Sequence, residues 1–424
     1  LPEDVPTVHH PRTDVVNPGF SLRLSVDAWL GHNEYGCSVH AASPVSTESF
    51  HPLPTHTALV PSPRQPNSPT VLSYQCACGN PVYFDSSLCL SCGSSLGFDP
   101  LTDRILPAAN SRLCSNGTRY NVCNWLVPPD SPSELCLACR LNRTIPDLTH
   151  PGNLPLWSRI EAAKRRALRS LVNMGLPLRT LAEDPDSGLA FDIVSHIADP
   201  AISTGYLAGV ITINLEEADD VHRRISQQQL GESSRTLLGH FHHECGHYVW
   251  ELAFAPWPPD HPIRAAFRSR FGDESSNYPA ALARHYSSGP PHGWESSFIS
   301  AYASSHPSED WAETWAHYLH LTEAMETCSH AGIHAHHLSL PLVPIPADAA
   351  SLPPPLINAT PPDDQLFLAA LQRWTCLTTV LNEVSLSLGE PRLYPFVIST
   401  TVAQKLRLAH HVAGFWGRRP ALLI

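Results

Sequence analysis

Five consecutive residues, His243-Glu-Cys-Gly-His247, have the types and spacing that can hold a metal ion and activate water. A predicted helix over about residues 233–254 places His243 and His247 one turn apart on one face, where both imidazoles can reach one zinc ion. Glu244 is offset by one residue, so its carboxylate can act as the base on a metal-activated water. In a chain with 25 histidines this pattern is not decisive alone, because helix histidines can simply be hydrated.

A second predicted helix, over about residues 308–327, carries the candidates for a third ligand. Glu309, Glu313 and His317 recur every four residues and form one polar stripe beside two tryptophans. Burying such a stripe is costly unless a metal ion or partner groups satisfy it. We expect Glu309 to complete a His2Glu zinc site, with Glu313 accepting a hydrogen bond from a ligating histidine. The reverse assignment, with Glu313 on zinc, stays open, and His317 is a third choice.

An H-E-x-x-H motif followed by E-x-x-x-E on a later helix resembles the gluzincin metallopeptidases, including the toxins of the lethal-factor type. The resemblance implies that the first glutamate of the second motif, here Glu309, ligates zinc. It also implies a catalytic tyrosine seven residues earlier, where this chain has Tyr302. Tyr302 would then donate a hydrogen bond to the developing oxyanion. A packed aromatic side chain on a predicted helix over 294–303 is the alternative.

Eight of the twelve cysteines fall between residues 76 and 139, in two quartets with paired spacing. Short C-x-C and C-x-x-C turns place two thiolates on one tetrahedral zinc ion, so we expect two structural zinc sites. The spacing is tighter in the first quartet than in the second, and disulfides or reduced core cysteines are the alternative. Few basic residues lie in this segment, which favours a structural or protein-docking role. The predicted ligands are Cys76, Cys78, Cys89 and Cys92 for the first site and Cys114, Cys123, Cys136 and Cys139 for the second.

The order of these motifs resembles one bacterial family, the zinc-binding metallopeptidases with an N-terminal zinc ribbon. Besides the cysteine pairs, the resemblance rests on segments 141–147 and 209–215, on Gly239-His-Phe before the histidine motif, and on the segment from Tyr302 to Pro307. It spans about residues 74–413. The resemblance implies a peptide or protein substrate and three zinc ions, one catalytic and two structural.

Composition limits the other classes of function. A net charge of −12 argues against a generally nucleic-acid-binding protein. No run of about 18 apolar residues predicts a membrane span, and the N-terminus lacks the pattern of a secretory signal. Clustered cysteines without an export signal favour metal binding in a reducing cytoplasm.

We expect an α+β protein in three parts. Residues 1–72 are rich in Pro, Ser and His and predict a disordered extension; 73–148 form a double zinc-ribbon module; and 149–424 form a mainly helical, zincin-like domain with a small sheet and a flexible loop over 329–362. Strands are expected over 189–194 and 209–215, the second as an edge strand that pairs with an extended substrate, as in zincin folds. Helices are expected over 156–174, 233–254, 260–270, 278–286, 294–303, 308–327, 364–388 and 399–413.

The first of these helices carries Lys164, Arg165, Arg166 and Arg169, which we interpret as a solvated face rather than a nucleic-acid contact. Two functional hypotheses follow from the whole sequence. The first is an active zinc peptidase; the same residues also suit hydrolysis of a non-peptide amide. The second is a zinc-ribbon adaptor that binds protein or nucleic acid, with a catalytically idle zincin domain. The base Glu244 favours the first, since an idle scaffold has no need of it.

Overall fold

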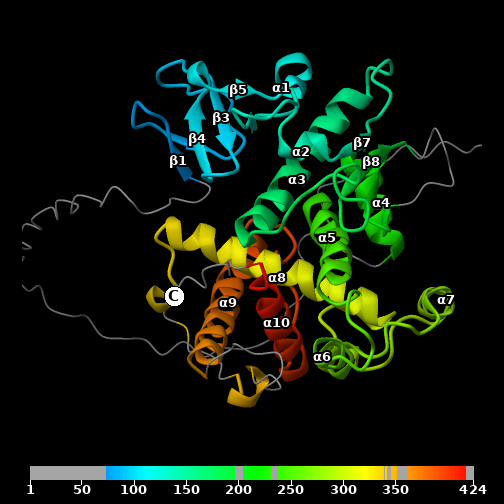
Figure 1. Ribbon diagram of the computed structural model, residues 1–424. Coiled ribbons are helices and arrows are strands. Elements are labelled where there is room, and N and C mark those ends of the chain that lie inside the picture. The colour runs from blue at the N-terminus through cyan, green and yellow to red at the C-terminus, as the bar shows by residue number, and fades with distance from the viewer. Residues whose placement is uncertain are drawn as a thin grey trace, which may run out of the picture. The chain divides into compact units, whose positions relative to one another are not determined.

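A computed structural model describes residues 73–195, 204–230, 236–338, 340, 345–350 and 361–416, all within one compact unit, Asn67–Ile424. The prediction of a disordered extension over residues 1–72 lies outside the described residues. Within them the fold is α+β, as predicted, and a cysteine-rich module precedes a mainly helical domain (Figure 1). None of the described helices has the length and apolarity that crossing a membrane requires.

The cysteine-rich module is built from three short antiparallel strand pairs, β1–β2, β3–β4 and β5–β6. Three rings fill its centre: the Phe98 ring lies 4.8 Å from the Phe84 ring and 5.2 Å from the Trp125 ring. With so little apolar area of its own, a module of this size needs further cross-links. Its elements are β1 Ser73–Gln75, β2 Pro81–Tyr83, β3 Leu96–Asp99, β4 Arg104–Pro107, β5 Arg112–Leu113, α1 Ser115–Tyr120, β6 Leu126–Val127 and α2 Leu137–Arg140.

A four-stranded sheet follows, in the order β7-β8-β10-β9. Strands β7 (Asn142–Thr144), β8 (Ala190–Val194) and β10 (Val210–Asn214) run parallel, and β9 (Gly205–Leu207) pairs antiparallel with β10. The prediction of 209–215 as an edge strand is therefore wrong, because β10 lies inside the sheet and β9 forms the edge. The chain reverses direction between β9 and β10 in a two-residue turn, Ala208-Gly209, which the sequence pattern did not reveal. Both residues have positive φ, 46° and 78°.

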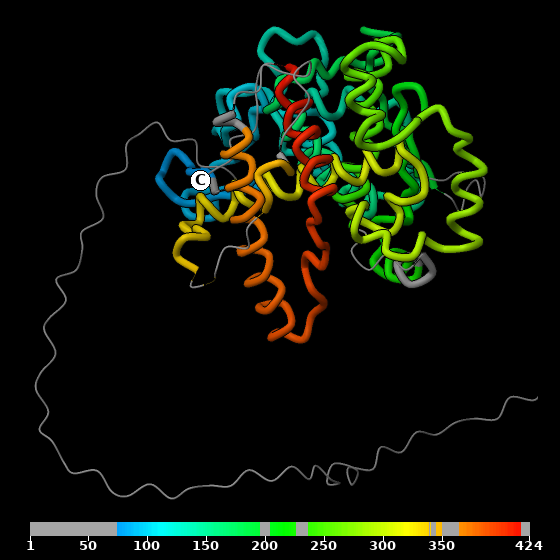
Figure 2. Tube along the Cα trace, turned by 90° about the horizontal axis from the view of Figure 1, so that it is seen from below, coloured from blue at the N-terminus to red at the C-terminus, as the bar shows by residue number. Residues whose placement is uncertain are grey.

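The helices of the second part surround one long central helix, α8. Figure 1 shows α8 crossing the molecule, with α3 and α5 on one side and α9 and α10 on the other. In Figure 2, α9 and α10 run as a pair whose connection lies at the far tip. The bounds are α3 Asn153–Met174, α4 Asp220–Leu230, α5 Leu237–Ala253, α6 Pro262–Phe271, α7 Tyr278–Ser288, α8 Pro307–His330, α9 Pro361–Ser387 and α10 Thr400–Ala413.

Two helix predictions differ from the structure. The predicted helix over 294–303 is wrong: only the 3₁₀ turns Trp294–Ser296 and Tyr302–Ser304 form there. The Ser300 hydroxyl accepts the backbone N–H of Ala303 at 3.1 Å, a local bond that competes with helix formation. Helix α4 was not predicted; it starts after Asp219, whose carboxylate accepts two backbone N–H groups. In the predicted loop 329–362, 3₁₀ turns form at Ala335–His337 and Ala347–Ala350.

The interpretation of the basic residues of α3 as a solvated face is wrong for three of the four; Arg166 stays partly exposed and pairs with Asp85. Lys164 is fully buried, and Arg165 and Arg169 are buried as well. Lys164 Nζ lies 2.9 Å from Glu161 Oε1, and Arg169 pairs at 2.8 Å with an aspartate of the cysteine-rich module, Asp103. Lys164 is neutralised from within α3 and Arg169 from the cysteine-rich module, so α3 joins this module to the helical part instead of facing solvent.

Candidate active site and metal centres

Close packing of α5 on α8 brings the histidine motif to the second carboxylate helix. Thr236 caps α5 by accepting the backbone N–H of Gly239 at 3.0 Å. About two turns after Gly239, Gly246 faces α8: a Cβ added there would lie 2.9 Å from the Ala312 Cα. The Trp311 indole donates a 2.8 Å hydrogen bond to the Gly246 carbonyl and fixes this crossing point. Glycine is therefore required at position 246 for the two helices to approach.

At this crossing His243, His247 and Glu309 converge on one point. The His243 and His247 Nε2 atoms are 3.2 Å apart, and His243 Nε2 lies 3.0 Å from Glu309 Oε2. His247 Nε2 lies 3.6 Å from Glu309 Oε1. Zinc with bonds of about 2.0–2.1 Å to tetrahedral donors would separate neighbouring donors by about 3.4 Å, so the three spacings fit a zinc ion.

Two further residues hold these donors in place. Glu313 Oε1 accepts from His243 Nδ1 at 2.8 Å, and its other oxygen accepts from the Ser300 hydroxyl at 2.6 Å. The Tyr278 hydroxyl, from α7, donates to Glu309 Oε1 at 2.7 Å. Burial opposes ionisation of Glu309, but the two imidazoles outweigh it and hold the pKa of this carboxyl well below its usual value. Glu309 is thus kept as an oriented carboxylate.

The two Cys clusters also have the spacing of metal sites. In the first, the sulfurs of Cys76 and Cys92 are 3.7 Å apart, as are those of Cys78 and Cys89. In the second, the sulfurs of Cys123 and Cys136 are 3.6 Å apart, and Cys114 accepts the backbone N–H of Cys136. These are far longer than a disulfide bond and match the edge of about 3.8 Å of a tetrahedral zinc–sulfur site with 2.3 Å bonds. The sulfurs of each quartet lie within 4.8 Å of one another.

Comparison with known proteins agrees with these donor sets. The profile of the "Putative zinc-binding metallo-peptidase" family matches residues 153–412, and that of a zinc-ribbon domain matches residues 73–150. The chain belongs to this metallopeptidase family. Uncharacterized proteins of Mycobacterium bovis and of two Mycobacterium tuberculosis strains are each 41% identical to it over 338 residues, which are 79% of this chain and 93% of theirs. No solved structure matches it significantly.

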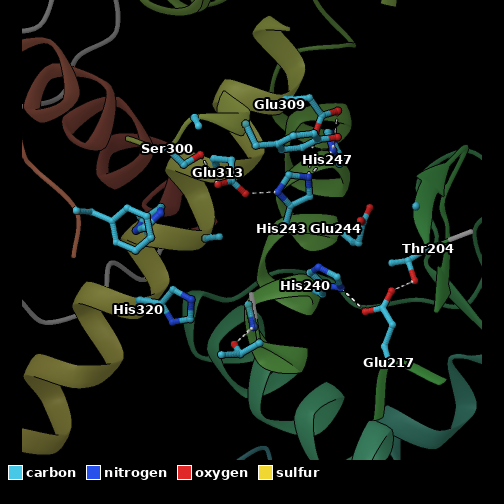
Figure 3. Close-up of a pocket in the computed structure, with 18 of the residues that line it drawn as sticks. Thr204, Glu217, His240, His243, Glu244, His247, Ser300, Glu309, Glu313 and His320 are labelled. Carbon is cyan, nitrogen blue, oxygen red and sulfur yellow. Dashed lines mark hydrogen bonds and ion pairs between the residues drawn. The ribbon is translucent and has the colours of Figure 1, made fainter. Parts of the chain in front are cut away.

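The metallopeptidase's His/Glu donors open into a cavity of about 1570 Å³ (Figure 3). Glu244 lines it, with only 7% of its surface exposed, and within the described residues its Oε2 has no hydrogen-bond partner. A buried carboxylate oxygen without a partner is costly unless a ligand or water meets it. Tyr302 lines the same cavity, with its ring 6.0 Å from the His243 ring. Burial and the nearby Glu309 raise the pKa of Tyr302, so its hydroxyl keeps its proton.

Other residues of this metallopeptidase site carried no clear sequence signal. His240 contacts Glu217, which also accepts from Thr204, and all three line the cavity (Figure 3). Glu217 comes from a 3₁₀ turn before α4, where no spacing relates it to the histidine motif. Tyr278 comes from α7, where nothing in the local pattern separates a tyrosine in a cleft from one in the core. His317 lies two helical turns from Glu309, and its Nδ1 is 3.0 Å from the Tyr394 hydroxyl.

Proposed function

We propose that this metallopeptidase hydrolyses peptide bonds with a zinc ion held by His243, His247 and Glu309. The single observation that supports it is the convergence of these three donors beside the unpartnered Glu244 oxygen in one cavity. Glu309 is preferred over Glu313 as third ligand because both Glu313 oxygens are engaged, one by His243 Nδ1 and one by Ser300. Glu313 then keeps the proton of His243 on Nδ1 and leaves Nε2 free to ligate.

A zinc ion at these donors supplies Lewis acidity and lowers the pKa of water to about 7. Glu244 accepts the proton of the attacking water on its free oxygen and delivers it to the leaving amine. The Tyr302 hydroxyl, protonated and facing the cavity, donates a hydrogen bond to the carbonyl oxygen as negative charge develops there. The edge strand β9, whose residues line the cavity, offers backbone groups to an extended peptide.

The two Cys quartets are proposed as structural zinc sites, which gives three zinc ions per chain. No disulfide joins the eleven cysteines within the described residues, which suits a reducing compartment such as the cytoplasm. Burial of Lys164, Arg165 and Arg169 leaves little basic surface on α3 for nucleic acid, so a protein partner is the better candidate for the zinc ribbons.

The decisive experiment compares Glu244→Gln with the unchanged protein on a peptide library, with zinc measured by mass spectrometry. We expect three zinc ions in both forms and a loss of cleavage of about 10²- to 10⁴-fold, the usual contribution of a general base. Glu134→Gln, at an exposed site, is the matched control and is expected to cleave normally. Equal cleavage by the Glu244→Gln form would remove the base assignment. A third zinc that never binds would favour the adaptor.

A further inference from the structure

The cavity extends well beyond what zinc and a scissile peptide bond occupy. Helix α8 lines it from Ser308 to Ala324, and 16 residues of helix at about 1.5 Å each span about 24 Å. The metal donor Glu309 lies at one end of this stretch. The other end of the same cavity is lined by α8, by α9 and by the connection from α9 to α10.

We call this compartment the aromatic chamber. Its walls are formed by two histidines and a small residue of α8, one tryptophan of α9 and two aromatic residues of the connection. In chain order these are His317, His320, Ala324, Trp374, Tyr394 and Phe396.

The walls of the aromatic chamber contact one another through ring packing. The Tyr394 ring lies 4.8 Å from the Trp374 ring and 5.0 Å from the Phe396 ring, and the Phe396 ring lies 4.3 Å from that of His317. Asn382 of α9 holds the connection at both backbone groups of Tyr394, accepting its N–H and donating to its carbonyl, each at 2.8 Å. The rings that line the chamber are therefore held in fixed positions by packing and hydrogen bonds.

The aromatic chamber carries no charge of its own near neutral pH. Burial lowers the pKa of His317 to about 4 and that of His320 to about 3, so both imidazoles are neutral. His317 Nδ1 is already paired with the Tyr394 hydroxyl at 3.0 Å. The opposite flank of the cavity differs, because Glu217, Arg223 and His240 line it. The Glu313 carboxylate, one helical turn from His317 in the same cavity, is already engaged by His243 and Ser300. A charged side chain entering the chamber would therefore lose its hydration without gaining an unengaged ion-pair partner.

We propose that the aromatic chamber binds a large uncharged side chain, aromatic or long aliphatic, of the peptide substrate. This rests on the proposed peptidase function and names its substrate class. The occupant follows from continuity, since one cavity joins the chamber to His243, Glu244 and Glu309. Along α8, His317 lies eight residues, or about 12 Å, from Glu309. An extended peptide advances about 3.3 Å per residue, so the recognised side chain lies about four residues from the scissile bond.

The test measures sequence preference in a peptide library with the zinc-loaded full chain. We expect substrates with Phe, Leu or Trp at one position about four residues from the cut to be favoured over Glu or Lys by about 10- to 100-fold in kcat/KM, as full burial of one such side chain gives. Ala324→Phe fills the chamber from a helical position and is expected to lower this preference about tenfold. Ala265→Phe, on the exposed face of α6 away from the cavity, is the matched control and leaves it unchanged.

A binding measurement separates failure of this inference from failure of the peptidase proposal. Two peptide hydroxamates, identical except for Phe or Glu at the fourth residue from the hydroxamate, are titrated calorimetrically into the zinc-loaded Glu244→Gln form. We expect tighter binding of the Phe compound, with the difference lost in the Ala324→Phe, Glu244→Gln double variant. Equal binding of both compounds overturns the chamber assignment. If the Phe compound binds more tightly but no Glu244-dependent cleavage is found, the chamber assignment stands and the peptidase proposal is removed.

Discussion

The two Cys clusters have similar sulfur geometry and very different surroundings. In the first, Cys78 and Cys92 are exposed, and the cluster closes a small hairpin at the periphery. In the second, all four cysteines are buried, and the Cys139 sulfur lies 3.9 Å from the Glu161 carboxylate on α3. The chain leaves this second cluster directly into β7, a strand of the sheet in the metallopeptidase domain. Metal-ligand spacing therefore identifies a site without saying how deeply the fold depends on it.

The largest expected difference is in folding. Cys136→Ser, in the second cluster, is expected to prevent folding of the metallopeptidase domain as well as the ribbon. A structural zinc site contributes on the order of 10 kcal/mol, comparable with a whole domain's stability of about 5–15 kcal/mol. Cys92→Ser, in the first cluster, should leave the helical domain folded because Cys92 is exposed and its sulfur contacts Cys76 and Ser94 of its own hairpin. Circular dichroism during thermal unfolding, with zinc counted per chain, measures both. Similar losses in the two variants would contradict the distinction.

An intermediate effect is expected from the ion pair that backs the second cluster. Glu161 accepts hydrogen bonds from Trp157, Asn142 and Lys164, and both Glu161 and Lys164 are fully buried. Glu161→Ala leaves the Lys164 ammonium buried without its partner, which costs about 3–5 kcal/mol. Urea unfolding measures this loss.

The matched control for that pair lies in the same module. Glu134 forms an ion pair with Arg119 at 3.2 Å, but both side chains are largely exposed. Glu134→Ala is expected to leave the urea midpoint unchanged, because exposed pairs contribute little. A midpoint shift as large as that of Glu161→Ala would show that the buried pair has no special role in joining module and domain.

Much of the candidate site was predictable because its donors have helical or turn spacing. The histidine motif, Glu309 and Glu313 follow α-helical periodicity, and the cysteine pairs follow tight turns, so local pattern was sufficient to nominate them. Tyr278 and Glu217 were not assignable, because their roles depend on contacts with α8 and α5 that no local pattern encodes. The aromatic chamber is formed likewise by residues that are distant in sequence.

The fold was predictable where an element's own residues determine it. The apolar periodicity of α5, α8 and α10 gave those helices nearly at their observed bounds. Prediction from periodicity failed where tertiary contacts or local polar hydrogen bonds determine the structure. Basic residues of α3 were interpreted as solvated because the packing that buries them, and the Asp103 partner of Arg169, come from other elements. Ser300 ends a helical pattern with one local hydrogen bond. The edge position of β9 depended on a two-residue turn flanked by short strands.

The smallest expected effect is a difference in the rate of metal loss. Cys78 and Cys92 are exposed, whereas all four cysteines of the second cluster are buried and Cys139 lies against Glu161 of α3. A difference in opening free energy of about 1.4 kcal/mol already changes the open population tenfold. Under a mild chelator with a thiol-alkylating reagent, we expect Cys78 and Cys92 to be labelled about tenfold faster than Cys136 and Cys139, as peptide mass spectrometry can resolve. Labelling in the reverse order would mean that the peripheral cluster is the more tightly closed one and that surface exposure does not govern metal release here.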